Sequence, residues 1–300
     1  MSVTKKEIAS LVSDFSIEVT PASAERVEAF ADHLVLGTSI NVTFLPGSSF
    51  TDTIRVSRRI HEEGFKPIPH LAARNFESSK ALEQSLDNLT SHANVEEVLI
   101  IAGGLDSPLG PYHSTMQILG SGLLEKYSIK KIGIAGHPEG SPDISNSDID
   151  AALNDKNAWA RNTDIEVYIA TQFCVEASVI LDWEARIKKL GNTLPIHIGL
   201  PGLATLKTLL KFAKMSGIGP SMRVLTRQTK NLAKLVMTQE PDIVITDLTS
   251  RVAKAPGSLI KKVHFYPFGG LAKTAAWANS VVNEQIEMKP NKGFKTCTDH

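Results

Sequence analysis

Polar side chains stand inside or directly after short apolar runs of this 300-residue chain, where they could act on a bound ligand. Glu18 lies within the run Phe15-Ser-Ile-Glu-Val19. Partial loss of water there favours the protonated carboxyl group that a general acid requires. The alternative is a buried carboxylate paired with a base such as Arg74. The position of Glu18 fits either role, a proton donor to a ligand or a buried carboxylate in an ion pair.

Gly- and Pro-containing turns with a polar side chain follow most of the apolar runs. Glycine in such turns lets the backbone approach a flat or phosphorylated ligand closely. Taken singly, each turn is explained by Gly and Pro ending a strand, but eight together favour a large ligand site. The positions are Glu18, Thr43, His70, 103–106, 136–140, Thr171–Gln172, 199–202 and 264–270.

Four histidines raise the alternative of a metal-dependent hydrolase, because His70, His137, His197 and His264 fall on or just after apolar runs. The first run lacks a His-x-His pair and no strand-end lysine supplies a bridging group. Hydrogen bonding to a ligand is therefore the favoured role, and no metal is predicted. Neither Gly-x-Gly-x-x-Gly nor Gly-Lys-Ser/Thr occurs, so a nucleotide would bind without these motifs. Cys174 is expected to be a small core residue.

Eight apolar runs alternate with segments of helical period, and a spacing of about 25 to 36 residues fits a helix plus a parallel strand. This pattern predicts an α/β fold, a (β/α)8 TIM barrel whose strand ends form the site. A doubly wound open sheet is the alternative. The runs are 14–18, 39–43, 66–70, 98–102, 131–135, 167–171, 195–199 and 263–266. The helical segments are 24–34, 54–63, 78–92, 116–127, 175–190, 205–215 and 270–282.

The interval before the last strand is about double the others. Leucines at helical spacing predict extra helices over 221–254, and a ninth strand at Ile243–Ile245 is the alternative. One catalytic barrel domain is expected over 1–288, followed by a polar, frayed C-terminal tail over 289–300.

Charge and hydropathy exclude several classes of partner. Thirty-two basic residues balance 32 acidic ones, whereas a general nucleic-acid binder needs a basic excess. No apolar stretch approaches the roughly 18 residues of a membrane span. Asp14 interrupts the apolar stretch that follows Lys5 and Lys6, so no secretory signal is predicted. We expect a cytoplasmic protein with a small-molecule substrate and neither nucleic-acid nor membrane partners.

Five short motifs occur in one order at successive strand ends: Ser16-Ile-Glu-Val-Thr-Pro21, Pro69-His-Leu71, His137-Pro-Glu139, Thr171-Gln-Phe173 and His264-Phe-Tyr266. With these motifs the chain resembles the methylenetetrahydrofolate reductase family from about Phe15 to Val282. The resemblance implies a barrel that holds FAD noncovalently and takes electrons from NADH or NADPH. It implies interconversion of 5,10-methylenetetrahydrofolate and 5-methyltetrahydrofolate, in one-carbon metabolism and methionine biosynthesis, by a homo-oligomer.

The resemblance also implies roles for individual residues. Glu18 matches the family's acid, which assists opening of the folate's five-membered ring, and Asp106 matches an aspartate near both flavin and folate. Gln172 matches the residue that hydrogen-bonds the pterin, and Tyr266 lies where it could contact the folate. The positions implied to contact the flavin are Thr43, His70, Asp106, Tyr112, Ala135, His137 and Arg161.

Three departures from the family pattern predict a divergent branch. Leu105 separates Gly104 from Asp106, His137 replaces a common tyrosine, and Leu206 replaces a phenylalanine found in some members. Altered flavin affinity, another electron donor or net oxidation of methyltetrahydrofolate would each fit these departures. The alternatives from other classes are a non-redox pterin- or folate-binding barrel, such as a methyl-transfer component or carrier, and the metal-dependent hydrolase.

Overall fold

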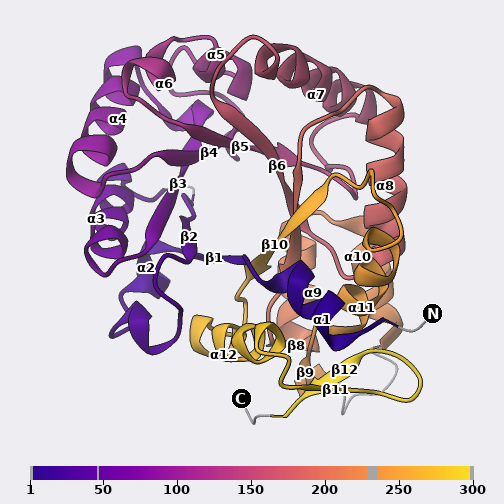
Figure 1. Cartoon of the computed structure of the whole chain (residues 1–300). Helices are drawn as coiled ribbons and strands as arrows, with labels where there is room; N and C mark the ends of the chain where they lie inside the picture. The colour runs from indigo at the N-terminus through magenta and orange to yellow at the C-terminus, as the bar shows by residue number, and fades with distance from the viewer. Residues whose placement is uncertain (1–2, 46, 229–234, 298–300) are drawn as a thin grey trace. The chain divides into compact units, whose positions relative to one another are not determined.

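The computed structural model describes residues 3–45, 47–228 and 235–297. Eight parallel strands form a closed barrel in the order β1-β10-β7-β6-β5-β4-β3-β2, surrounded by helices (Figure 1). This confirms the predicted (β/α)8 barrel and excludes the open sheet. The barrel strands are β1 (Ser16–Val19), β2 (Ser39–Val42), β3 (Lys66–Ala72), β4 (Glu97–Ile101), β5 (Lys131–Gly136), β6 (Glu166–Phe173), β7 (Ile196–Pro201) and β10 (Ile260–Tyr266).

Most of the predicted helical segments are helices in the structure. The α-helices are α1 (Lys5–Val12), α2 (Pro21–Ala24), α3 (Phe50–Glu62), α4 (Ser79–Ala93), α5 (Thr115–Leu119), α6 (Leu123–Lys126), α7 (Asn146–Ala160), α8 (Ala177–Lys189), α9 (Leu206–Met215), α10 (Gly219–Gln228), α11 (Asp242–Val252) and α12 (Leu271–Val282). None of these described helices is both long and apolar enough to cross a membrane. Helix α7 was not identified from the sequence.

The chain divides into two compact units. We call Ile17–Ala135 with Asp155–Ala170 the β2–β5 unit. Met1–Ser16, Gly136–Asn154 and Thr171–His300 form the β7–β10 unit.

In the β2–β5 unit, strands β2 to β5 pair in parallel and in sequence order. Helix α3 buries Thr53, Val56, Ser57 and Ile60, a spacing of three and four residues that places them on one face. Helix α4 buries a similar leucine stripe and packs against α3. These periodic faces explain why both helices were identified from the sequence.

The predicted helix over 24–34 is wrong. Helix α2, capped at its start by the Thr20–Ser23 capping box, ends at Ala24, and only a 3-10 turn, Phe30–Asp32, follows. The reason is a clamp from helix α3: the Arg59 guanidinium donates hydrogen bonds to the carbonyl oxygens of Ala24, Val27 and Glu28 at 2.9, 2.6 and 2.9 Å. These carbonyl oxygens accept hydrogen bonds from the arginine instead of from the N–H groups of a continuing helix.

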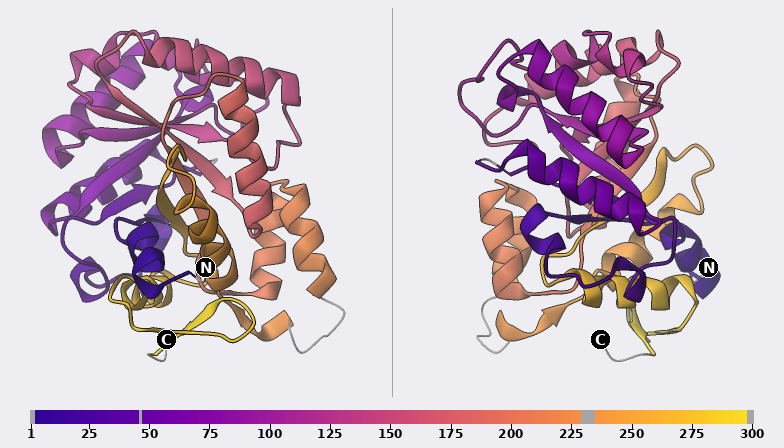
Figure 2. Two further views of the ribbon diagram at one scale, coloured as in Figure 1. Left: turned by 45° about the vertical axis from the view of Figure 1, so that its right-hand side comes forward. Right: turned by 90° about the vertical axis from the view of Figure 1, so that its left-hand side faces the viewer.

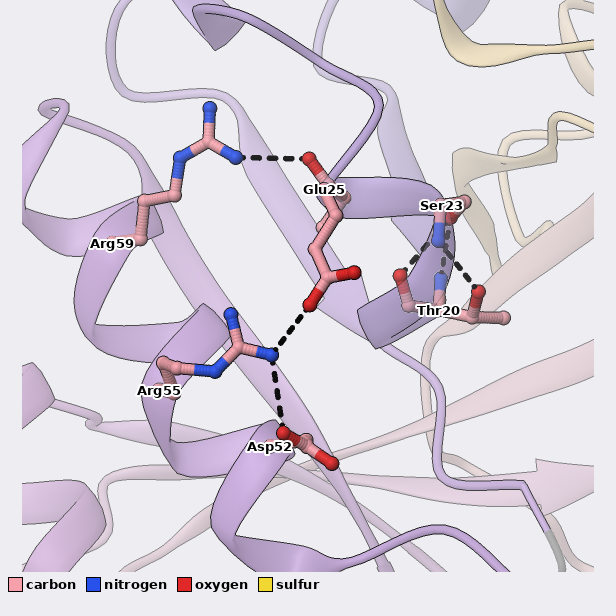
Figure 3. A network of polar contacts seen from close by, with 7 residues as sticks. Thr20, Ser23, Glu25, Asp52, Arg55 and Arg59 are labelled. Atoms are coloured by element: carbon pink, nitrogen blue, oxygen red, sulfur yellow. Dashed lines mark hydrogen bonds and ion pairs between the residues drawn. The ribbon is translucent and has the colours of Figure 1, made fainter.

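A second arginine on α3 holds the end of α2. Arg55 donates to Glu25 at 2.8 Å and to Asp52 at 3.1 Å, and Figure 3 shows it between the two carboxylates. Further along, the predicted helix over 116–127 is divided into α5 and α6. Gly122 between them has φ +71°, a left-handed conformation that interrupts a helix.

In the β7–β10 unit, β10 pairs in parallel with β7, and His264 lies opposite Gly199. Helices α9, α10 and α11 precede β10, which confirms the predicted extra helices; residues 229–234 of that stretch lie outside the described residues. Helices α9 and α10 lie side by side as a pair (Figure 2). The alternative strand at Ile243–Ile245 is wrong, because these residues belong to α11.

Two short ribbons in this unit were not predicted. Strands β8 (Ala204–Thr205) and β9 (Thr238–Gln239) pair in antiparallel fashion. Strands β11 (Ile286–Met288) and β12 (Phe294–Thr296) form an antiparallel hairpin, and β12 lies within the segment 289–300 that was expected to be a frayed tail. Phe294 is fully buried and stacks on Trp277 with ring centroids 5.6 Å apart. Burial of this one aromatic ring explains why the otherwise polar segment is ordered through β12.

Candidate functional site

Three partly buried aromatic rings lie next to one another beyond the carboxyl ends of β6 and β10. Tyr266 and Phe268 are stacked at 5.7 Å, and Phe268 and Phe212 are stacked at 4.1 Å with an interplanar angle of 15°. Phe173 meets Phe268 edge-on from the buried side. We call Phe212, Tyr266 and Phe268 the aromatic platform. Stacked, half-buried rings of this kind suit a flat apolar ligand.

The Tyr266 ring lies across strand β7 because residue 199 is a glycine. A Cβ on Gly199 would stand 2.6 Å from Cε2 of Tyr266 and 2.5 Å from the carbonyl oxygen of Thr171. The Tyr266 hydroxyl donates to that same oxygen at 2.8 Å. The Gly199 N–H donates to Oγ1 of Thr171 at 2.9 Å. This close approach fixes the tyrosine relative to the end of β6.

Gln172 lies beside Thr171 and its side chain is partly exposed. Its Oε1 accepts a hydrogen bond from the backbone N–H of Glu139 at 3.2 Å. Because an N–H needs an acceptor, this bond sets which end of the amide faces Glu139. The Nε2 group of Gln172, a donor of two hydrogens, has no hydrogen-bond partner among the residues described.

Glu139 follows β5 and is tied to the start of α10. Its Oε2 accepts from the backbone N–H of Ser221 at 2.8 Å, and its Oε1 accepts from the Ser221 hydroxyl. Burial raises the pKa of Glu139, and hydrogen bonds from Ser221 and Cys174 oppose that rise in part. Glu139 is thus a carboxylate held in a partly desolvated position one loop away from the platform.

Cys174 and the histidines take structural or hydrogen-bonding positions. Burial raises the pKa of the Cys174 thiol well above its usual value, with the Glu139 charge adding to the effect. An inert, buried thiol agrees with the predicted core role. His264 Nδ1 lies 3.0 Å from the Ser16 hydroxyl, both groups are buried, and the His264 ring meets Tyr266 edge-on. Among the described residues no group of three or more candidate ligands forms a metal site.

In the β2–β5 unit, three predicted site residues lie on neighbouring strands. Glu18, on β1, is partly buried. Thr43 follows β2, its N–H donates to Val19 O at 2.8 Å, and its Oγ1 is buried with no hydrogen-bond partner in the described structure. His70, on β3, is buried with Nε2 3.1 Å from Oδ1 of Asn41.

Asp106 and Tyr112 belong to the loop after β4, which Arg74 holds in place. The Arg74 guanidinium donates to the carbonyl oxygens of Leu105 at 2.9 Å and His113 at 3.0 Å. Arg74, the partner considered for Glu18, is therefore engaged with backbone oxygens instead. Asp106 is exposed, whereas Tyr112 is buried.

The last two predicted flavin contacts in this unit lie at opposite strand ends. Ala135 is near the carboxyl end of β5. Arg161 is exposed and follows α7, before β6 begins at Glu166, whose N–H bonds to Lys130 just ahead of β5. Arg161 thus lies at the amino edge of these strands, away from Ala135. The structure does not bring Arg161 to the carboxyl edge of the strands, where the flavin contact was expected.

Of the predicted site residues, Gln172 and Tyr266 both lie in the β7–β10 unit. Gln172 follows Thr171 in the chain, and the Tyr266 hydroxyl donates to the Thr171 carbonyl oxygen. His137 is in the same turn as Glu139. The motif His137-Pro-Glu139 was identified from the sequence, but no role was predicted for Glu139. No role was predicted for the aromatic residues Phe212 and Phe268 either. No local pattern in the sequence predicted a role for Ser221, because its partner Glu139 lies 82 residues away in the chain.

A cavity of about 760 Å³ also lies in the β7–β10 unit, between the start of α8, the end of β7, and α10 and α11. Of the positions predicted from the sequence to form the site, Pro201 and Gly202 of the turn 199–202 line it. Its charged lining residues are Glu176, Glu240, Asp242, Asp247, Lys289 and Lys292.

No family model matches the chain. Among solved structures, it is similar to a protein from Clostridium thermocellum that binds two copies of 5-methyl-5,6,7,8-tetrahydrofolic acid. That similarity has a TM-score of 0.53 and 14% identity, covering 94% of this chain and 99% of the other. A second similar structure is dihydropteroate synthase from Thermus thermophilus, with a TM-score of 0.45 and 9% identity over 87% of this chain and 91% of the other. The first similarity shows the shared barrel fold.

Proposed function

We propose that this protein binds a reduced folate, with the pterin ring against the aromatic platform of the β7–β10 unit. The main supporting observation is the stack of Tyr266 and Phe268. Tyr266 bonds the carbonyl oxygen of Thr171, the residue before Gln172, and the Gln172 amide has an NH2 group without a partner among the described residues. A pterin is a flat ring with hydrogen-bonding groups along one edge. Stacked aromatic faces and a few placed polar groups are what such a ligand requires.

Two further observations support the proposal. The loop that contacts Gln172 through the Glu139 N–H also carries the Glu139 carboxylate, and carboxylates accept charge-assisted hydrogen bonds from ring N–H and amino groups. The Clostridium thermocellum protein, which has the same fold, binds 5-methyltetrahydrofolic acid. The fold similarity makes a folate a reasonable ligand to test first, and the residues named above define where it would bind.

The first experiment is calorimetric titration of the protein with 5-methyltetrahydrofolate. Saturable binding is expected, and Tyr266→Leu should weaken it by about tenfold or more, since stacking on an aromatic ring contributes about 1 kcal/mol or more. Tyr127→Leu is the matched control, because Tyr127 is a partly exposed tyrosine in the β2–β5 unit. Absence of binding, or equal losses in both variants, would contradict the proposal.

A second candidate function is flavin-dependent interconversion of 5,10-methylenetetrahydrofolate and 5-methyltetrahydrofolate with NADH or NADPH. The observation in its favour is the buried Thr43 hydroxyl, which lacks a partner and lies at a position implied to contact the flavin. When bound, a flavin would supply hydride transfer. In this candidate Glu18 protonates the folate ring nitrogen. Arg161 does not fit, because it lies at the amino edge of the strands.

The flavin is tested separately by the visible absorption spectrum of the purified protein, before and after incubation with FAD. A flavin spectrum and its bleaching by NADH or NADPH would support the second candidate. Glu18→Gln should then leave flavin reduction intact and slow the folate half-reaction by about a hundredfold or more. Colourless protein that takes up no FAD would leave folate binding as the function and remove the redox activity.

A further inference from the structure

We propose that Ser221 is a positioning residue for the aromatic platform: through the α9–α10 pair it holds Phe212 in the stack, and so sets how tightly the platform binds a flat ring. This inference rests on the proposed binding of a reduced folate at the platform. Ser221 is fully buried, so any effect of this residue on a ligand must pass through another side chain.

The first step is the set of hydrogen bonds that Ser221 makes at the start of α10. Its backbone N–H donates to Oε2 of Glu139 at 2.8 Å, and its hydroxyl donates to Oε1 of the same carboxylate. The hydroxyl oxygen also accepts the backbone N–H of Val175 at 3.1 Å. A hydroxyl has one donor hydrogen and two acceptor positions, so both bonds form together. One buried side chain thus joins α10 to the loops that leave β5 and β6.

The second step is another contact between the loop after β5 and the α9–α10 pair. Gly217, in the turn that joins the two helices, has φ +64°. A Cβ on this residue would stand 2.4 Å from Cγ of Pro142. The backbone of the turn therefore lies directly against the proline ring. The loop after β5 contacts the helix pair at two points, the start of α10 and this turn.

The third step is the connection from this turn to Phe212 on α9. The Ser216 N–H donates to the carbonyl oxygen of Phe212 at 2.9 Å, and the Ile218 N–H donates to that of Ala213 at 3.2 Å. Both helices pack into the apolar cluster to which the aromatic platform belongs. Packed side chains transmit a displacement instead of absorbing it. A shift of α10 would therefore move Phe212.

The fourth step is what such a shift does to the platform. Phe212 stacks on Phe268 at 4.1 Å and comes from α9, whereas Tyr266 belongs to β10. Ser221→Ala removes one donor to Glu139 and leaves the Val175 N–H without its acceptor. Unpaired polar groups at the start of α10 destabilise its docked position. Phe212 should then be displaced from the stack, and a flat ligand loses part of its contact surface.

The test is calorimetric titration with 5-methyltetrahydrofolate at a temperature where every variant is folded. Ser221→Ala should weaken binding by about threefold to tenfold, the contribution of one aromatic contact. Thr4→Ala is the matched control, because the Thr4 hydroxyl donates to Glu7 in the capping box of α1, in the same unit. This variant loses a comparable helix cap and should bind with unchanged affinity.

A double-mutant cycle shows whether Ser221 acts through Phe212. Phe212→Leu alone should weaken binding, and adding Ser221→Ala to it should cause no further loss. A further loss of the same size would overturn the inference, because Ser221 would then act through another group such as the Glu139 carboxylate. Gly217→Ala is a second variant that separates the loop from the turn. It should weaken binding in wild type and have no effect beside Phe212→Leu.

Amide hydrogen exchange provides a measurement that needs no ligand. Exchange over α9 should be faster in Ser221→Ala and unchanged in Thr4→Ala, and equal exchange in wild type and Ser221→Ala would overturn the link to α9. Equal affinity of wild type and Ser221→Ala for 5-methyltetrahydrofolate would overturn the positioning role and leave folate binding standing. Failure of wild-type protein to bind would overturn the proposed function together with the inference.

Discussion

Ser221 donates two hydrogen bonds to Glu139, one from its backbone N–H at 2.8 Å and one from its hydroxyl. Ser221 is the third residue of α10, where backbone N–H groups have no partner within the helix. The carboxylate of a loop 82 residues earlier in the chain thus caps this helix. A negative charge at that end also interacts favourably with the helix dipole.

The pH dependence of stability should reveal the environment of Glu139. Burial raises its pKa above the ordinary 4.5, so the folded state holds this proton more tightly than the unfolded state does. Deprotonation therefore lowers the free energy of unfolding as the pH rises from about 4.5 to the raised pKa, and not beyond. Urea denaturation of wild type and Glu139→Gln at several pH values measures this.

The stability of wild type relative to Glu139→Gln should decline through that window and then stay constant. Glu166→Gln is the control, because Glu166 is exposed, and its difference from wild type should lack this decline. A Glu139→Gln difference that rises with pH would mean that hydrogen bonds from Ser221 outweigh burial.

Gly199→Ala should disturb both stability and ligand binding. The added Cβ would meet the Thr171 oxygen and the Tyr266 ring, and such overpacking costs about 1–3 kcal/mol. Displacement of Tyr266 should also weaken binding of 5-methyltetrahydrofolate. Gly219→Ala is the control, since its Cβ would point into open space. Chemical denaturation and calorimetric titration measure the two effects, and a stable Gly199→Ala variant with normal binding would contradict the geometry.

Arg59→Ala should release the segment after α2. Three hydrogen bonds to carbonyl oxygens and the ion pair with Glu63 are lost, which should cost about 2–3 kcal/mol. Amide hydrogen exchange over 25–34 should become faster. Arg58→Ala, one residue earlier and paired only on the surface with Glu62, should cost less than about 0.5 kcal/mol. Similar losses in the two variants would refute the clamp.

Phe294→Ala should show that the C-terminal hairpin is part of the folded core. Removal of a fully buried phenylalanine costs about 3–5 kcal/mol, and the Trp277 fluorescence should change because its stacked partner is lost. Lys295→Ala removes an exposed ion pair with Glu287 and should be nearly neutral. Thermal unfolding followed by fluorescence compares them; an unchanged Phe294→Ala melting temperature would mean that the hairpin does not contribute to stability.

The barrel was predictable because its signals are local and repeated. Each strand is a bounded apolar run, and helices such as α4 carry leucines at helical spacing. The segment 24–34 has the same apolar spacing, yet Arg59, which lies 31 to 35 residues later in the chain than the carbonyl groups it contacts, binds them from helix α3. Long-range hydrogen bonds of this kind leave no periodic signal in the sequence.

The site was predictable only in part, for the same reason. Gln172 and Tyr266 lie at the carboxyl ends of β6 and β10, so their position at strand ends could be deduced. Partnership between Glu139 and Ser221 depends on how α10 folds back onto the loop after β5. Likewise, Phe294 looks like a single apolar residue in a polar segment, and only the folded structure shows that it covers Trp277.

Two arginines one turn apart on α3 should respond differently to ionic strength. The Arg55 side chain is 51% exposed, and its partners Glu25 and Asp52 are exposed to 61% and 46%. Dissolved salt weakens such exposed attractions once the Debye length shortens to about 3 Å, near 1 M. Arg59 is 31% exposed and bonds mainly to backbone oxygens. Concentrated salt would therefore loosen the side of the segment near Glu25 while the turn around Val27 remains anchored.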